Sequence, residues 1–418
     1  MILLKNATYI DPLSFTQKET SILVEEGTGK GIKFVGPDAR ADKVIDCRGK
    51  FVTRAYVNGH HHVYSALARG MHAPKKSPTN FSETLEYIWW TLDQKLDAEM
   101  IRLSALTTAI ACAKRGCTFA IDHHASPNML KGSLEIIAKA FDEVGVGHLL
   151  AYEITDRYGE AKAVESLEES DDYLKNRPGL VGMHASFTVE QHTLLKAVEI
   201  AAKHNTGVHI HVAEDPVDEK LTREKYGVSV MERLRQAGAL DLKGNILGHG
   251  LHFDDDEREI VKNSGSWMAV NADSNLNNRV GFFTSKGLGD KIMLGTDGMH
   301  SDMIKSAQTA LFAGQNFDEV DMGMIYNRLR NSEKYLHENG HAFGENNLIV
   351  LDYDSPTPLT ENNFIGHFFF GFENRHITHS ISNGKLIYAD GKILSVDEEN
   401  ILKESAKAAM LLWDEMVK

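Results

Sequence analysis

The chain contains 418 residues, of which 42% are apolar and 25% are charged. These fractions are typical of a globular protein with a sizeable core, and they exclude a mostly disordered or fibrous chain. The 59 acidic residues outnumber the 45 lysines and arginines, which gives a net charge of −14. We therefore expect neither a general nucleic-acid binder nor a protein that binds anionic membranes, because both need basic surface.

The sequence has no apolar run of about 18 residues, the length that a membrane-spanning helix needs. The short apolar run at the start is interrupted by Lys5, so we expect no secretory signal and no membrane span. Cys47, Cys112 and Cys117 cannot all pair, and they form no Cys-x-x-Cys motif. This cysteine usage is typical of a reducing compartment, and we expect a cytoplasmic location.

The two ends of the chain have the pattern of short strands. Residues 1–53 contain short apolar runs separated by Gly and Asp-Pro turn signals. Residues 346–418 start with another apolar run, contain the hairpin signals Asn383-Gly384 and Asp390-Gly391, and close with an amphipathic stretch. We predict that 1–53 and 346–418 together form a small β-sandwich domain.

The middle of the chain, residues 54–345, alternates apolar runs with helical patterns. The eight runs are 55–58, 119–122, 149–154, 180–183, 207–212, 246–248, 267–270 and 292–295. Two of the helices carry capping-box patterns, Thr188 with Gln191 and Asp254 with Glu257. Eight strand–helix units predict an α/β fold with a TIM-like (β/α)8 barrel. A doubly wound open sheet remains the alternative, because periodicity does not distinguish a closed sheet from an open one.

Nearly every predicted strand ends in residues that bind metals or transfer protons. They are Asn58 to His62, Asp122 to His124, Glu153, His184, His209 to Glu214, His249, Asn271 with Ser274 and Asn275, and Asp297. Barrel enzymes carry their catalytic groups at the carboxyl ends of the strands. The pattern therefore predicts an active site at this end.

Strand geometry indicates which of these side chains face together. Residues i and i+2 of a strand point to the same side, so His60 and His62 share a face, which is a common start for a divalent-metal site. His209 and His211 also share a face, so alternation alone does not choose between them, although His211 is nearer the strand end. The fourth strand ends in His184 with no lysine, which favours one ion over a lysine-bridged pair.

At these positions the sequence resembles the amidohydrolase superfamily, and more closely its triazine hydrolase and cytosine deaminase branch. The matching motifs, in family order, are His60-x-His62, His211-Val-Ala-Glu214, His249-x-x-His252, Ser274-Asn275-Leu276-Asn277-Asn278-x-x-Gly281 and Leu294-Gly295-Thr296-Asp297-Gly298. With the flanking β segments, the resemblance covers essentially the whole chain. Three further stretches are similar to aminohydrolases associated with selenium-dependent purine metabolism. They are Trp89-Trp90-x-Leu92-Asp93, His184-Ala185-Ser186-Phe187-Thr188 and Ser355-Pro-Thr-Pro-Leu359.

The resemblance implies one divalent ion per chain, Zn²⁺ before Fe²⁺, which lowers the pKa of a bound water toward about 7. The implied ligands are His60, His62, His211 and Asp297. Asp297 would also take the proton of the water, and Glu214 would deliver a proton to a ring nitrogen or to the leaving amine. His249 would hold the hydroxide and stabilise the tetrahedral intermediate; a hydrogen-bonded core histidine is the alternative for it.

Other side chains are candidates for contact with a substrate. They are Trp90, His123, His184 and His300, since aromatic rings and imidazoles often line pockets. For Trp90, plain packing is an equal alternative. Structural roles around the site are expected for His61, His124, His209 and His252.

Three positions depart from the family pattern, and one of them is Gly250, which follows His249 where a cysteine is frequent. Arg54-Ala55 stands where Pro-Gly is usual before the first barrel strand, and Asn346-Asn347 stands where Ala-Asp is common. The leading hypothesis is a hydrolase that deaminates a small heterocycle such as a purine, pterin or triazine. One alternative is hydrolysis of a cyclic amide, or of another C–N or a C–halogen bond, at the same site. A catalytically inactive metal-binding relative is another. The resemblance also implies a homodimer.

Overall fold

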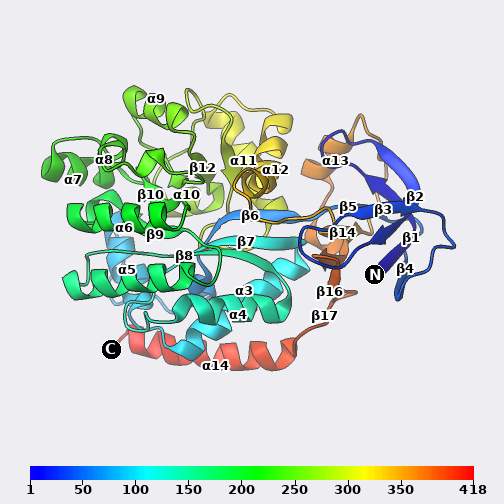
Figure 1. Cartoon of the computed structure of the whole chain (residues 1–418), viewed down its shortest axis with the longest axis horizontal. Coiled ribbons are helices and arrows are strands. Elements are labelled where there is room, and N and C mark those ends of the chain that lie inside the picture. Colours follow the sequence, from blue (N-terminus) through cyan, green and yellow to red (C-terminus); the bar gives the residue numbers. More distant parts are fainter.

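The computed structural model describes all residues from 1 to 418 and shows a mixed α/β architecture (Figure 1). Eight parallel strands form its centre, in two sheets with the orders β6-β7-β8 and β9-β10-β11-β12-β13. Their bounds are β6 Tyr56–His61, β7 Cys117–His124, β8 Gly147–Tyr152, β9 Val181–Ala185, β10 Val208–Val212, β11 Ile246–His249, β12 Trp267–Val270 and β13 Ile292–Leu294. Each predicted apolar run overlaps one of these strands, so the eight predicted strands are confirmed.

The two parallel sheets meet at both of their edges. A bridge between His61 and Asp297 joins β6 to the segment after β13, and a bridge between Ile154 and Met183 joins the end of β8 to β9. Buried side chains from both sheets pack in a single cluster. They include Val57, Phe119, Leu149, Ile246, Trp267 and Met293. The carboxyl ends of strands that are distant in sequence therefore open onto one region.

Helices follow most of the strands. Their bounds are α3 Ala98–Lys114, α4 Ser133–Val144, α5 Glu160–Leu174, α6 Gln191–Lys203, α7 Pro216–Tyr226, α8 Val230–Gln236, α9 Asp255–Ser264, α10 Ala272–Asn278, α11 Met303–Phe317 and α12 Met322–Glu338, with short 3-10 turns η3 Ser186–Thr188 and η4 Ala239–Asp241. The predicted capping box of Asp254 and Glu257 is present at the start of α9. The predicted capping box of Thr188 and Gln191 is wrong. α6 begins after Glu190 and has no side-chain cap. The Thr188 hydroxyl lies 2.8 Å from His184 Nδ1 instead.

The connection between β6 and α3 is long and folds into short helical turns. They are η1 Val63–Ala68, α1 Phe81–Thr84, the π-helical η2 Leu85–Trp89 and α2 Trp90–Asp93. Phe81, Leu85, Trp89 and Trp90 of this connection line a cavity together with residues from the strand ends. Trp89 and Trp90 of the Trp89-Trp90-x-Leu92-Asp93 motif therefore lie over the predicted active-site end.

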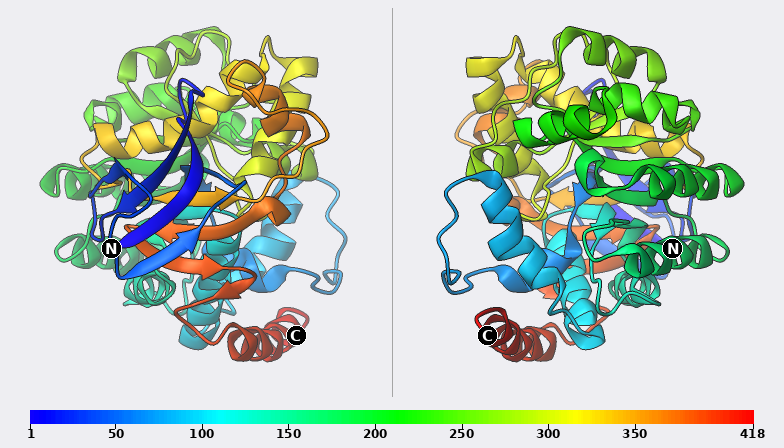
Figure 2. Two further views of the ribbon diagram at one scale, coloured as in Figure 1. Left: turned by 90° about the vertical axis from the view of Figure 1, so that its right-hand side faces the viewer. Right: turned by 90° about the vertical axis from the view of Figure 1, so that its left-hand side faces the viewer.

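The two ends of the chain build one mixed sheet of nine strands beside the parallel strands (Figures 1 and 2). Its strands are β1 Ile2–Ile10, β2 Gln17–Val24, β3 Ile32–Val35, β4 Lys43–Asp46, β5 Phe51–Arg54, β14 Leu348–Leu351, β15 Ile377–Ser382, β16 Lys385–Ala389 and β17 Lys392–Ile393. β5 pairs antiparallel with β14, with Arg54 opposite Leu348. Segments separated by about 300 residues thus share one hydrogen-bonded ladder, as the β-rich pattern of both ends suggested.

The remaining helical elements are α13 Phe364–Phe370, η5 Asn374–His376 and α14 Glu398–Met416. α14 leaves the terminal sheet and lies against α3 (Figure 1). Lys114 of α3 forms an ion pair of 2.6 Å with Glu398 at the start of α14. No helix of the chain combines the length and the apolar character needed to cross a bilayer.

Two of the departures from the family pattern, Arg54-Ala55 and Asn346-Asn347, lie at the junction between the terminal sheet and the parallel strands. Arg54 Nη2 lies 2.5 Å from Glu333 Oε1 of α12, and both side chains are largely buried. The Asn346 amide donates to the carbonyls of Glu25 and Gly27 at 2.7 Å. Asn347 Oδ1 accepts from the Asn383 backbone at 3.0 Å. These residues therefore contact the terminal sheet and α12.

We predict that Arg54→Ala lowers the free energy of unfolding by about 2–4 kcal/mol, because it leaves the Glu333 carboxylate buried without its partner. Urea denaturation measures the change. Arg48→Ala is the matched control, since the Arg48 side chain is 79% exposed and lies 3.9 Å from its partner Asp46. Equal midpoints for the two variants would show that the Arg54–Glu333 pair contributes little.

Candidate metal centre

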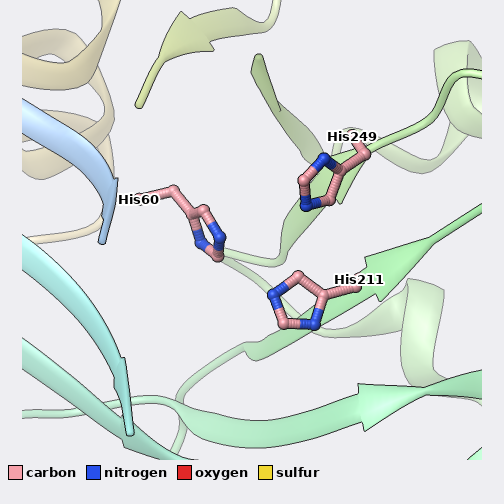
Figure 3. Close-up of side chains that lie close together, drawn as sticks. All are labelled: His60, His211 and His249. Atoms are coloured by element: carbon pink, nitrogen blue, oxygen red, sulfur yellow. The ribbon is translucent and has the colours of Figure 1, made fainter. Parts of the chain in front are cut away.

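Three buried histidines from different strands converge at the carboxyl end of the parallel sheets. His60 lies in β6, His211 in β10 and His249 at the end of β11, and their rings face a common space (Figure 3). One ring nitrogen from each lies within 4.8 Å of those of the other two. His60, His62 and Asp297 form a second group with the same spacing. The structure thus brings together the four residues that the resemblance implies as ligands.

Backbone carbonyls fix the orientation of two of these rings. His62 Nδ1 lies 2.6 Å from the carbonyl of His123, and His211 Nδ1 lies 2.8 Å from the carbonyl of His184. A carbonyl only accepts, so each Nδ1 carries a proton, and in the neutral ring each Nε2 presents a lone pair. The two Nε2 atoms are 3.1 Å apart, whereas two ligands of one tetrahedral zinc ion stand about 3.4 Å apart. This arrangement fits a cation between them.

Asp297 completes the group of ligand atoms. Its Oδ1 lies 3.2 Å from His62 Nε2 and 4.0 Å from His60 Nε2. His60 Nε2 is buried and has no hydrogen-bond partner, while His60 Nδ1 lies 2.7 Å from His209 Nε2. His60 therefore also presents a nitrogen without a partner to the same space.

The charges of the cluster favour a positive ion. Burial lowers the pKa of His60 and of His211 well below the ordinary value, and neighbouring histidines add to the effect. Burial acts in the same direction on His62, but the hydrogen bond and charge of Asp297 overcome it and raise its pKa to about 9. Divalent metals bind neutral imidazoles and ionised carboxylates, so a cation that binds His62 displaces a proton from its ring. The donor set therefore fits a divalent cation.

Glu214 and His249 lie beside this cluster. His249 Nε2 is 3.5 Å from Glu214 Oε2 and 3.6 Å from Asp297 Oδ2. His249 Nδ1 lies 2.8 Å from Asn275 Oδ1 of α10, which fixes the ring. Burial raises the pKa of Glu214 to about 7, the charge of His249 opposes the rise and that of Asp297 adds to it. A carboxyl group with such a pKa can hold and release a proton near neutral pH.

The backbone is strained where it presents these side chains. Ala213, His249 and Asp297 adopt φ angles of 45°, 70° and 52°, in the left-handed region that residues other than glycine rarely occupy. Such conformations cost about 1 kcal/mol or more each and concentrate at functional sites. At Ala213 the conformation is held by a hydrogen bond of 2.9 Å from its N–H to the buried Asp218 carboxylate. Sequence reasoning missed Asp218, because nothing local marks its role.

The four residues that were predicted to contact a substrate lie in different parts of the structure. Trp90 and His184 line the cavity with Glu153 and Glu214. His123 is fully buried, and its Nε2 lies 3.1 Å from the His209 carbonyl. His300 Nε2 lies 3.4 Å from Asp273, and His300 lines a different cavity.

Residues that sequence reasoning did not select also line the cavity. They include Tyr64, Ser65, Phe81, Leu85, Asn278 and Met299. Phe81 and Leu85 follow Pro-containing loop sequence, where no strand-end signal exists to find them. The histidines whose roles the sequence left open contact neighbours: His61 lies 3.2 Å from Ser301, His124 lies 2.9 Å from Ser126, and His252 lies 2.7 Å from the Val280 carbonyl.

Parallel strands that present histidines and carboxylates around a divalent-cation site define a metal-dependent hydrolase. The sequence model of the amidohydrolase family matches residues 51–342, and the chain belongs to this family. A 5'-deoxyadenosine deaminase of Methanocaldococcus jannaschii is 27% identical over 99% of this chain and 100% of that protein.

Solved structures share the fold. An adenosine deaminase of Xanthomonas campestris with bound zinc has a TM-score of 0.83 at 16% identity and covers 99% of this chain and 98% of its own. An atrazine chlorohydrolase of Arthrobacter aurescens, complexed with zinc, has a TM-score of 0.80 at 15% identity over 98% of this chain and 100% of its own. The match of the family model to residues 51–342 confirms the expected superfamily.

We predict that Asn275→Ala lowers kcat by about 10- to 100-fold while the metal content stays unchanged, because His249 loses the partner that orients its ring. Steady-state kinetics and metal analysis by mass spectrometry measure the two effects. Asn277→Ala is the matched control, since Asn277 lies on the same helix and is exposed. An unchanged kcat in Asn275→Ala would contradict a role for an oriented His249.

Proposed function

We propose that the protein is a metal-dependent aminohydrolase that replaces an exocyclic amine of a small nitrogen heterocycle by oxygen and releases ammonia. The observation that carries the proposal is the convergence of the His62 and His211 Nε2 lone pairs beside Asp297. Membership of the amidohydrolase family and the similarity to deaminases of adenine nucleosides support it.

The proposed cofactor is one divalent ion per chain, Zn²⁺ before Fe²⁺. Its proposed ligands are His60, His62, His211 and Asp297. Such an ion supplies Lewis acidity that makes water a nucleophile at neutral pH. The zinc in the two solved relatives supports this choice of metal.

The surrounding side chains would handle the protons of the reaction. Asp297 accepts a proton from the attacking water, and His249 orients the oxygen nucleophile through its Nε2. Glu214 donates a proton to a ring nitrogen of the substrate. As the C–N bond breaks, the amine leaves as ammonia with protons passed on by these carboxyl groups. The 3.5–3.6 Å spacing of His249 from both carboxylates supports such a relay.

The proposed substrate site is the cavity beneath the connection after β6. Trp90 and His184 line it and would contact the heterocycle directly. His123, which lies 3.4 Å from Glu153, and His300 are also proposed to contribute. The similarity to the atrazine chlorohydrolase keeps one alternative open, the hydrolysis of a C–halogen bond at the same site.

We also propose an architecture for the whole chain. Residues 54–345 would form one closed (β/α)8 barrel, and residues 1–53 with 346–418 a composite β-sandwich domain; the bridges at both edges of the parallel sheets support the first. A homodimer in the cytoplasm is the proposed setting, and the three unpaired cysteines agree with a reducing compartment.

Purified protein is predicted to contain about one zinc or iron ion per chain. In His211→Ala the chain loses both the metal and turnover, because one of the converging lone pairs is removed. Metal analysis and an activity assay measure the two losses. His192→Ala, which replaces an exposed histidine of α6, is the control and keeps both. A wild-type protein that folds fully and takes up no metal would contradict the proposal.

Ammonia release is predicted from at least one member of a panel of aminopurines, aminopterins and aminotriazines. A coupled ammonia assay measures it, with atrazine and chloride detection as the comparison for the alternative. Chloride release without ammonia would favour the C–halogen reaction. Full metal occupancy with no turnover of any compound would indicate an inactive relative.

A further inference from the structure

The cavity wall beside His211 carries two hydrogen-bond acceptors, Glu153 and His184. Both residues line the cavity, and their potential ligand atoms lie within 4.8 Å of one another and of a His211 nitrogen. Glu153 follows β8 and is only 3% exposed. The sequence marked it as a strand-end residue, but the proposed proton relay does not use it.

The Glu153 carboxylate has one oxygen that is free for a ligand. Its Oε1 accepts a hydrogen bond of 2.9 Å from Arg157 Nη2. Its Oε2 lies 3.4 Å from His123 Nδ1, and this nitrogen has no hydrogen-bond partner. A carboxylate oxygen with no donor, buried against a cavity, favours a ligand that brings an N–H group.

The neighbouring His184 also presents an acceptor. Its Nδ1 lies 2.8 Å from Thr188 Oγ1, and that hydroxyl is positioned to donate to the Ala185 carbonyl at 3.1 Å. The hydroxyl proton is then used, so His184 Nδ1 must donate to Thr188 and His184 Nε2 carries a lone pair. Neither acceptor has a donor within the protein.

Buried charges hold this wall in place. The Arg157 guanidinium lies 4.6 Å from the Trp90 ring centre and 3.4 Å from the Asp93 carboxylate, and the Tyr158 hydroxyl lies 2.9 Å from Asp93. Arg157 is thereby fixed between two carboxylates and an aromatic face. Its hydrogen bond keeps the Glu153 side chain in one orientation.

Glu214 belongs to a different group of side chains in the same cavity. Its ligand-capable atoms group with those of His249 and Asp297, whereas Glu153 and His184 group with His211. A heterocycle bound in this cavity therefore meets the proton donor and the two acceptors at different places on the cavity wall.

Resting on the proposed function, we propose that the substrate carries a ring N–H directly beside the amine-bearing carbon, and that Glu153 and His184 accept this N–H and an N–H of the exocyclic amine. Amino lactams such as guanine or a pterin have this pattern, with a ring nitrogen on the opposite flank for Glu214. The amine-bearing carbon of an adenine compound, the class named for the M. jannaschii relative, lacks it. Glu153 is then a specificity-determining residue.

The test compares guanine with 1-methylguanine, in which a methyl group replaces the ring N–H beside the amine-bearing carbon. With zinc-loaded full-length protein, methylation is expected to lower kcat/KM by about 10- to 100-fold. Glu153→Gln is expected to lower kcat/KM for guanine by a similar factor, mostly through KM, because the amide presents an N–H where an acceptor is needed. The preference for guanine over 1-methylguanine then shrinks about 10-fold or more.

Equilibrium dialysis of the two compounds against the zinc-loaded Glu214→Gln variant, which lacks the proposed proton donor, measures binding without turnover, and the same order of affinities is expected. Glu160→Gln is the control variant, because Glu160 is exposed at the start of α5. If Glu153→Gln does not fold, the comparison of the two compounds in the unaltered protein still decides the outcome.

The outcomes of the inference and of the proposed function are separable. Ammonia release from adenine compounds, with guanine and 1-methylguanine bound equally, would overturn the inference and leave the deaminase proposal standing. Preferred binding of guanine without any ammonia release would support the inference and contradict the deaminase. Two zinc ions per chain, with Glu153→Gln losing one, would show that Glu153, His184 and His211 hold a cation instead, and would overturn the inference.

Discussion

Two backbone carbonyls determine what the histidine cluster can bind. By accepting the Nδ1 protons of His62 and His211, the carbonyls of His123 and His184 leave both Nε2 lone pairs facing one point. The two Nε2 atoms are 3.1 Å apart, close enough to share either a proton or a metal cation. Each carbonyl belongs to the strand next to the one that ends near its histidine: β7 lies beside β6, and β9 beside β10. The parallel sheets themselves therefore place the Nδ1 protons of the site.

The active-site end combines this fixed geometry with backbone strain. Ala213, His249 and Asp297 occupy the left-handed region just where β10, β11 and β13 end. The strain is maintained by hydrogen bonds to buried groups, of Ala213 to Asp218 and of Gly298 to Asp297. The left-handed residue at each strand end redirects the chain toward the cavity. The stability of the surrounding sheets offsets the conformational free energy that this backbone strain costs.

The departures at Arg54 and Asn346-Asn347 change contacts between the terminal sheet and the rest of the chain, and they lie away from the cavity. Arg54 binds Glu333, and Asn346 and Asn347 bind loops of the terminal sheet. None of the three lines the cavity near the histidines. The reading as an inactive relative therefore draws no support from them, because the changed residues do not reach the proposed metal ligands.

The sequence by itself determined the eight central strands, the β-rich ends and the set of residues at the strand ends, because periodicity and turn chemistry are local. It placed His60 and His62 on one face, but it left His209 and His211 undecided, since both alternate alike. The family resemblance chose His211, and the tertiary structure gives the physical reason: His211 contacts His62, while His209 contacts the other ring nitrogen of His60. The tertiary structure also assigned the Thr188 hydroxyl to His184 rather than to a helix cap, and it revealed Asp218, Phe81 and Leu85. These roles depend on contacts between segments far apart in the chain, which no local pattern encodes.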